Sequence, residues 1–268
     1  EPMEIPSFIL GDTITTEQRD YFDEFGFIRF AKVATHDEVD LLLEALEALQ
    51  ARFVAEKRQK VMGTPLKWGK TPDGNDFIQR FAFASHYSST VHRFVSDPRF
   101  EPVRRFISND ARLAEIEKDG VVVNHWINEV GSRYRRLGWH TDGLRDLAFL
   151  RLPGPMLNVG LYLDDSPLEK GGVRILPGTH RQGLLPMMFR KFYFFDNRPD
   201  PAEVSLTAEK GDLTIHDGRL WHRTAQATVD GDASRRRNMY MPYIVGPLAP
   251  KTEDSPTPIY HRLQGMVG

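Results

Sequence analysis

The chain has 268 residues and a formal net charge of −2; 40% of its residues are hydrophobic and 27% charged, which excludes a disordered chain. The near-neutral charge, the lack of long basic runs and the lack of a membrane-length apolar run argue against nucleic acid and membranes as partners. The absence of cysteine excludes disulfides, thiolate metal sites and a cysteine nucleophile, and it agrees with a reducing cytoplasm, where we expect the protein to lie.

Two capping boxes mark the beginnings of the N-terminal helices. Thr15 and Gln18 begin a short helix in "TTEQRDYFDEF", and Thr35 and Glu38 begin a longer one that reaches about Val54. Between these helices, "GFIRFAKV" alternates as a strand does. The chain is therefore expected to open with a helix, a strand and a second helix.

The pattern changes twice after the second helix. Residues 62–90 mix glycine, proline, aspartate and aromatic residues without a clear period, which is typical of a long functional loop, and residues 97–118 predict another helix or two. Short β-rich runs separated by turns then follow, at 121–130, 157–163, 173–176, 204–207, 212–216, 221–226 and 238–245. Many short strands at this spacing indicate a jelly roll or barrel. We therefore predict a mainly β protein with flanking helices, in one domain over 1–268, with a helical part of about 14–118, a jelly-roll core of about 119–246 and an irregular tail.

The motif "WHTDGLRD" places His140 and Asp142 two positions apart. In an extended strand both side chains point to one face, where an imidazole and a carboxylate are two of the three ligands of a 2-His-1-carboxylate metal site. The same pair also occurs as a surface hydrogen bond, so a third ligand has to decide. His216 and His222 in "GDLTIHDGRLWHRTAQ" are the candidates, and the motif context favours His222, with His216 as a partly buried strand residue near the site.

A run of three arginines follows in "SRRRNMY". An arginine on the strand after the second metal histidine has the geometry to bind a dicarboxylate through two parallel hydrogen bonds. Three neighbouring arginines are, however, more often a solvated strand edge. The run by itself leaves both interpretations open.

These segments together resemble the phytanoyl-CoA dioxygenase-like branch of the Fe(II)/2-oxoglutarate-dependent oxygenases, and the similarity covers most of the chain. It rests on "DYFDEFGFIRFAKVATHDEVDLL", "GWHTDG", "LNVGLYLDDSPLEKGGVRILPGTHRQG", "GDLTIHDGRLWHRTA" and "RRRNMYMPYIVG", in this order. The resemblance implies a cupin-like double-stranded β-helix, that is, a jelly roll, with N-terminal helices. It also implies that His140, Asp142 and His222 bind Fe(II) and that 2-oxoglutarate and O2 are cosubstrates.

The resemblance further implies which residue holds the far end of 2-oxoglutarate. Arg236 would bind the distal carboxylate, because Tyr243, seven residues later, then fits the closing aromatic position of the family. Arg235 and Arg237 are close competitors, since a slip of one residue along a strand turns the opposite face inward.

Further positions follow from the same comparison of motifs. Thr224, two residues after His222, would place a hydroxyl near that carboxylate. Asn128 in "NEVGS" falls where relatives often carry a basic contact to the cosubstrate, and its neutral amide departs from that pattern. Trp139 is expected either beside the metal or as a core aromatic residue. Asp142 disfavours halogenation, because halogenating relatives replace this carboxylate with a small residue.

The expected reaction is oxidation of a C–H bond, with hydroxylation as the default outcome and oxidative cyclisation or epimerisation as alternatives. Residues 62–90 and 182–200 are expected to decide the substrate, and the second segment, rich in Met and Phe, would form an apolar lid over the iron. It would otherwise cover an exposed face or a dimer interface, and the oligomeric state stays open. As a lid it points to a sizeable apolar or aromatic small molecule, in the tailoring of a secondary metabolite such as a polyketide antibiotic.

Two other classes of protein fit parts of the pattern. An inactive cupin-like binding protein would share the fold, but His140, Asp142, His222 and an arginine at 235–237 are all intact, which argues against decay of the site. A zinc hydrolase could use the same three ligands. It would have no use for the downstream arginine, and it would need a general base that the sequence does not identify.

Overall fold

The computed structural model describes residues 3–71, 73–130, 132, 134–144, 146, 153–258 and 261, and every feature below lies within them. The first part of the chain forms helices and short strands: α1 (Thr16–Phe25), β1 (Phe27–Phe30), α2 (His36–Ala55), β2 (Lys60–Val61), β3 (Thr64–Pro65), β4 (Lys67–Lys70), β5 (Asp76–Phe81), α3 (Ala84–Tyr87), α4 (Ser89–Val95), the 3-10 helices η1 (Pro98–Phe100) and η2 (Val103–Phe106), and β6 (Arg112–Leu113). The second part is mostly strands: β7 (Val122–Asn128), β8 (Leu137–His140), β9 (Met156–Tyr162), η4 (Leu168–Lys170), β10 (Gly172–Ile175), η5 (Thr179–Arg181), α5 (Leu184–Phe189), β11 (Val204–Ser205), β12 (Leu213–Asp217), β13 (His222–Ala225) and β14 (Gly231–Ile244).

Both predicted capping boxes form. At α1 the Thr15 hydroxyl accepts a hydrogen bond from the Gln18 backbone N–H, and the Gln18 side chain accepts one from the Thr15 N–H. The same reciprocal pair joins Thr35 and Glu38 at the start of α2. α1 ends at Gly26, whose φ of 79° favours glycine, and β1 follows at once. The predicted order of helix, strand and helix is confirmed.

The prediction for residues 62–90 is wrong in its secondary structure. This segment is not one loop: it contains β3 to β5 and α3, and the β4–β5 hairpin extends the large sheet through the pairing of β5 with β7. A shift of register between Lys67 and Trp68 breaks the alternation, and the strands are short, so no period is visible in the sequence. The helices predicted in 97–118 are only the 3-10 turns η1 and η2, whereas the regular helix α4 precedes them.

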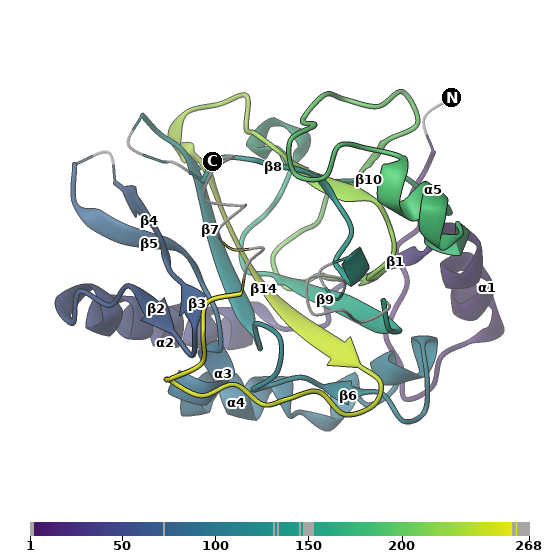
Figure 1. Ribbon diagram of the computed structural model, residues 1–268, viewed down its shortest axis with the longest axis horizontal. Helices are drawn as coiled ribbons and strands as arrows, with labels where there is room; N and C mark the ends of the chain where they lie inside the picture. Colours follow the sequence, from purple (N-terminus) through teal and green to yellow (C-terminus); the bar gives the residue numbers. More distant parts are fainter. Residues whose placement is uncertain are drawn as a thin grey trace.

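Two antiparallel sheets form the centre of the molecule. The large sheet has the order β1-β12-β9-β14-β7-β5-β4, with β6 paired to β14, and the small sheet has the order β11-β10-β13-β8. Figure 1 shows β14 as a long strand through the middle of the molecule, beside β7 and β9. The seven strand runs predicted after residue 119 all contain observed strands, and the mainly β, jelly-roll class is confirmed.

The two faces of the large sheet have different surroundings. One face joins α2 in the main apolar core, to which the helix contributes Val39, Leu42, Leu46, Leu49 and Phe53. The other face looks toward the small sheet across a cavity that residues of both sheets line. The cavity lies between the sheets, as a jelly roll allows, and it contains the candidate site.

The structure does not test the expected domain boundaries or the whole of the expected tail. The single-domain boundaries stay a prediction, and the C-terminal tail falls partly outside the described residues. In the described ranges, no helix combines the length and the apolar character that a membrane span requires.

Candidate active site

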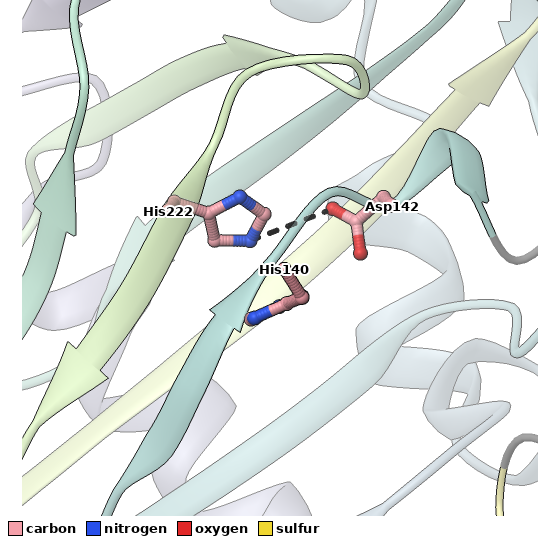
Figure 2. A group of neighbouring side chains, drawn as sticks. All are labelled: His140, Asp142 and His222. Atoms are coloured by element: carbon pink, nitrogen blue, oxygen red, sulfur yellow. Dashed lines mark ion pairs between the residues drawn. The ribbon is translucent and has the colours of Figure 1, made fainter. Parts of the chain in front are cut away.

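The small sheet brings His140 and His222 side by side. His140 is the last residue of β8, His222 is the first residue of β13, and the two are direct partners across the strand pair. Asp142 lies two residues beyond His140, and Figure 2 shows its carboxylate facing the two rings. One ligand atom from each residue lies within 4.8 Å of the other two. The structure therefore assembles the three residues that the motifs singled out, from positions far apart in the chain.

The hydrogen bonds of the two histidines fix their tautomers. His140 Nδ1 lies 2.7 Å from the Gly138 carbonyl oxygen, and His222 Nδ1 lies 3.0 Å from the Leu220 carbonyl oxygen. A carbonyl only accepts, so in both rings Nδ1 carries the proton and donates. In the neutral ring the lone pair then lies on Nε2, the atom that a metal ligand offers, and the backbone carbonyl holds the ring in this orientation.

The carboxylate of Asp142 is buried, with only 3% of the residue exposed. Its Oδ2 accepts a hydrogen bond of 2.9 Å from the Asn158 side-chain amide on β9 and lies 3.8 Å from His222 Nε2. The buried carboxylate and the two imidazoles together offer one oxygen and two nitrogen atoms as ligands for a cation. The donor set, two neutral imidazoles and one carboxylate, fits a divalent first-row metal and is the set typical of non-haem Fe(II) sites.

His216 lies close to this group without belonging to it. It is on β12 of the large sheet, across the cavity from His140 and His222, with its ring centroid 4.6 Å from that of His222. Its Nε2 is 3.6 Å from Asp142 Oδ2, beyond hydrogen-bond distance. The geometric group of three contains His222 and not His216. This agrees with the sequence analysis, which favoured His222 over His216 as the third ligand.

The three consecutive arginines of β14 have different environments. Arg236 is 3% exposed and points into the space between the sheets, where its guanidinium lies 4.9 Å from the centroid of the Trp126 ring. It donates to the carbonyl oxygens of Lys170, at 2.7 Å, and Ala225, at 3.3 Å. No described carboxylate forms an ion pair with it, and burial lowers its pKa to about 10.

Arg235 and Arg237 point to the opposite face of the sheet and are both paired. Arg235 forms an ion pair with Asp232. Arg237 forms ion pairs of 2.8 Å with Asp164 and with Glu47 of α2. Of the three, only Arg236 is buried toward the cavity side and free of a carboxylate partner in the described structure.

Thr224 and Asn128 lie in different parts of the structure. Thr224, on β13, lines the cavity beside the metal group. Asn128, at the end of β7, does not line it: the side-chain amide donates to Asp230 Oδ1 at 2.7 Å and to the carbonyl oxygen of Val229 at 3.2 Å, and its oxygen accepts from Gln226. This side chain closes the turn before β14, and its role toward the cosubstrate stays a prediction.

Trp139 is a core residue rather than a wall of the cavity. Its side chain is fully buried with Leu176 and Trp221, and its indole N–H donates to the Arg198 carbonyl oxygen at 2.9 Å. Of the two interpretations of this residue, the structure supports the core aromatic.

Several polar residues that line the cavity were missed in the sequence. They are Arg80, Lys118, Asp119, Asn124, Tyr134, Asn158 and Tyr240. Asn158 interrupts the apolar strand "MLNVGLY" at a position that alternation turns inward, and such an interruption is the signal that could have found it. Arg80 comes from the segment 62–90, which therefore reaches the cavity through a charged residue.

The segment 182–200 does not form the expected apolar lid. None of its residues is among those lining the cavity. Leu185, Phe189 and Phe192 are 68–75% exposed at the surface. Only its inner part touches the site: the Phe194 ring centroid is 5.0 Å from that of His140, and Tyr193 donates to the Thr141 carbonyl oxygen. The segment supports His140 from behind, and the argument it gave for an apolar substrate no longer holds.

Comparison with known proteins identifies the same pattern. The family described as Phytanoyl-CoA dioxygenase (PhyH) matches residues 22–237, which include His140, Asp142, His222 and Arg236. A comparison with curated proteins gave no match.

Solved structures share the fold at low sequence identity. EvdO2 from Micromonospora carbonacea var. aurantiaca, complexed with 2-oxoglutarate, is 21% identical with a TM-score of 0.60, covering 94% of this chain and 97% of that one. HygX from Streptomyces hygroscopicus, with iron bound, is 19% identical with a TM-score of 0.61, covering 90% and 89%. SnoN, a non-heme alpha-ketoglutarate-dependent epimerase from nogalamycin biosynthesis, is 21% identical with a TM-score of 0.61, covering 88% and 85%.

Proposed function

The chain belongs to the phytanoyl-CoA dioxygenase family of Fe(II)/2-oxoglutarate-dependent dioxygenases, and we propose that it uses His140, Asp142 and His222 to bind iron and oxidises a C–H bond of a small molecule. The observation that carries this proposal is the buried group of three ligand atoms within 4.8 Å of one another. Iron, when bound there with 2-oxoglutarate and O2, supplies the oxidising power for the C–H bond. The chain's own residues hold the metal and bind the cosubstrate.

The first task of those residues is to hold the metal. The Gly138 and Leu220 carbonyls keep both histidines in the Nδ1–H form, so that each Nε2 lone pair is available without loss of a proton. Asn158 holds the carboxylate of Asp142 at one oxygen. These contacts pre-orient the ligands before the metal arrives, and burial of all three residues keeps bulk water away.

The second task is to bind 2-oxoglutarate, and we assign its distal carboxylate to Arg236 and Thr224. A guanidinium that is buried without a carboxylate partner is costly, and a dicarboxylate entering the cavity would supply that partner. The Trp126 ring contacts the Arg236 guanidinium and also stacks on the ring of Tyr134, with a centroid distance of 4.2 Å between the two aromatic rings. This stack fixes the guanidinium, whereas Arg235 and Arg237 are occupied by Asp232 and Asp164.

The reaction outcome and substrate are the finer part of the proposal. We keep hydroxylation in the tailoring of a secondary metabolite as the first choice. SnoN, which acts as an epimerase in nogalamycin biosynthesis, supports both that setting and epimerisation as the alternative outcome, with cyclisation beside it. A small molecule stays the only partner proposed, as the enzyme class implies, and the cytoplasm stays the proposed compartment because the chain has no cysteine.

Anaerobic spectroscopy tests the metal and cosubstrate sites without the primary substrate. Fe(II) and 2-oxoglutarate added to the protein should give the weak visible charge-transfer band of a chelated keto acid. His222→Ala should abolish the band because one of three ligands is gone. A wild-type protein that gives no band, or a His222→Ala variant that keeps it, would contradict the proposal and favour a binding protein or a zinc site.

The arginine run offers a matched set of variants for the cosubstrate. Arg236→Ala should raise the dissociation constant of 2-oxoglutarate by roughly 10- to 100-fold, as expected for loss of a charge-assisted pair, while Fe(II) binding persists. Arg235→Ala and Arg237→Ala should leave that constant unchanged. If either neighbour has the larger effect, the register assigned to β14 is incorrect.

A further inference from the structure

His216 combines deep burial with a lack of hydrogen bonds. It is 1% exposed, and neither Nδ1 nor Nε2 has a hydrogen-bond partner in the described structure. Its neighbours are close but do not bond to it: Asp142 Oδ2 lies 3.6 Å from Nε2, and the ring centroid of Tyr240 lies 6.4 Å from its own. Buried polar atoms are almost always satisfied, so two unsatisfied nitrogens on one ring need an explanation.

A structural role within the chain does not explain this histidine. Asp142 Oδ2 already accepts from Asn158 at 2.9 Å, which holds the carboxylate from the same side of the cavity. An apolar side chain of similar size would fill the same space without leaving polar atoms unpaired. His216 does line the cavity, so a molecule that enters the cavity can reach it. A molecule that occupies the cavity, and not another part of the protein, is therefore the partner to be identified.

The inner face of the large sheet indicates which ligand this is. Arg236 and Tyr240 lie four residues apart on β14 and therefore share that face. Tyr240 pairs with Gly160 of β9, and His216 on β12 pairs with Asn158 of the same strand. The sheet thus presents, in order, Arg236, Tyr240 and His216, and the last of these lies beside Asp142.

This row matches the two ends of a keto dicarboxylic acid. The distal carboxylate belongs to Arg236 in the proposed function, so the keto-acid end must lie toward the metal ligands, where His216 is the residue with free nitrogens. We propose that His216 donates a hydrogen bond to the keto-acid end of 2-oxoglutarate and positions it. The inference rests on the proposed function. A neutral imidazole has one N–H to donate, and no change of protonation is needed.

The test measures 2-oxoglutarate binding to the Fe(II)-loaded protein under anaerobic conditions, by titration of the charge-transfer band. His216→Phe keeps the ring volume and removes both nitrogens. It should raise the dissociation constant of 2-oxoglutarate by roughly 10- to 100-fold, the effect of losing a hydrogen bond to a charged group. The band maximum should also shift, because the band arises from the keto-acid end. His216→Gln, which keeps an amide donor, should recover part of the affinity.

Two controls separate positioning from a general effect on the fold. His125→Phe replaces a half-buried histidine of the large sheet whose Nε2 is also unpaired, on the face away from the cavity, and should change neither the affinity nor the band. Arg236→Ala should weaken 2-oxoglutarate binding without moving the band maximum. A band shift that occurs in His216→Phe and in neither control therefore shows that His216 contacts the keto-acid end of 2-oxoglutarate.

The possible results are all decisive. If His216→Phe binds 2-oxoglutarate as the wild type does, with the same band, the inference is overturned and His216 faces the primary substrate instead. If the variant loses Fe(II) as His222→Ala does, His216 is a metal ligand and the inference is equally wrong. A wild-type protein without any band contradicts the proposed function itself, which is a different and recognisable failure.

Discussion

The two faces of the large sheet carry the same strands and have opposite characters. The outer face packs Val159, Leu161, Ile215 and Met239 into one apolar core with α2, and its arginines are paired. The inner face presents Asn158, His216 and Tyr240 to the cavity and also carries Arg236; of these, His216 has no hydrogen-bond partner and Arg236 no carboxylate partner in the described structure. The outer face contributes stability and the inner face offers groups to a ligand. Successive residues of each strand point to opposite faces, so neighbouring residues in the sequence serve different roles.

The largest expected effect is on the stability of the outer face. Leu161 is fully buried there, so Leu161→Ala should lower the free energy of unfolding by about 3 kcal/mol, through lost burial and the cavity left behind. Urea unfolding followed by circular dichroism measures the change. His216→Phe on the inner face should lower it by far less. Equal losses from the two variants would mean that the inner face is core as well.

The next largest expected effect is a loss of Fe(II) affinity from a substitution on the inner face. Asn158→Leu removes the donor to Asp142 Oδ2 and should weaken Fe(II) binding by roughly 10- to 100-fold, the usual cost of losing a partner of a metal ligand. Asn124→Leu is the matched control, since Asn124 faces the same cavity but donates to Asn238. Metal titration under anaerobic conditions compares the two. Similar losses in both variants would assign the effect to the cavity wall in general.

The smallest effect is a pH dependence on the outer face. Burial lowers the pKa of His125 from 6.5 to about 3, so the unfolded chain takes up a proton between these values and the folded chain does not. The stability contributed by the neutral ring is complete above pH 6.5 and is lost as the pH falls toward 3. Between pH 6.5 and 5, the wild type should lose roughly 1–2 kcal/mol more than His125→Phe. Parallel pH curves for the two proteins would exclude this contribution.

Local chemistry was predictable in this protein wherever neighbours in the sequence act together. Thr15 with Gln18 and Thr35 with Glu38 close their capping boxes within one turn, and His140 and Asp142 share a face because they are two residues apart on a strand. The choice of Arg236 over its neighbours needed a register, which the family resemblance supplied. The structure then separated the three arginines by face and by partner.

The two wrong predictions, for residues 62–90 and 182–200, have a common physical cause. The segment 62–90 forms strands because β7 provides a partner for β5, and no local period announces that pairing. The Met- and Phe-rich segment 182–200 has the composition of a lid, yet its position beside His140 follows from where the chain returns to the small sheet. Composition describes what a segment could cover; the packing of distant segments decides what it does cover.

The sequence by itself determined the helix starts, the strand-rich second half and the residue types of a ferrous site, because these depend on contacts a few residues long. Only the tertiary structure decided that His222 rather than His216 completes the group of three, that Asn158 holds Asp142, and that Asn128 closes a turn. Each of these depends on strands that meet after long intervening segments. Which face of which strand looks into the cavity is settled only when the two sheets pack together.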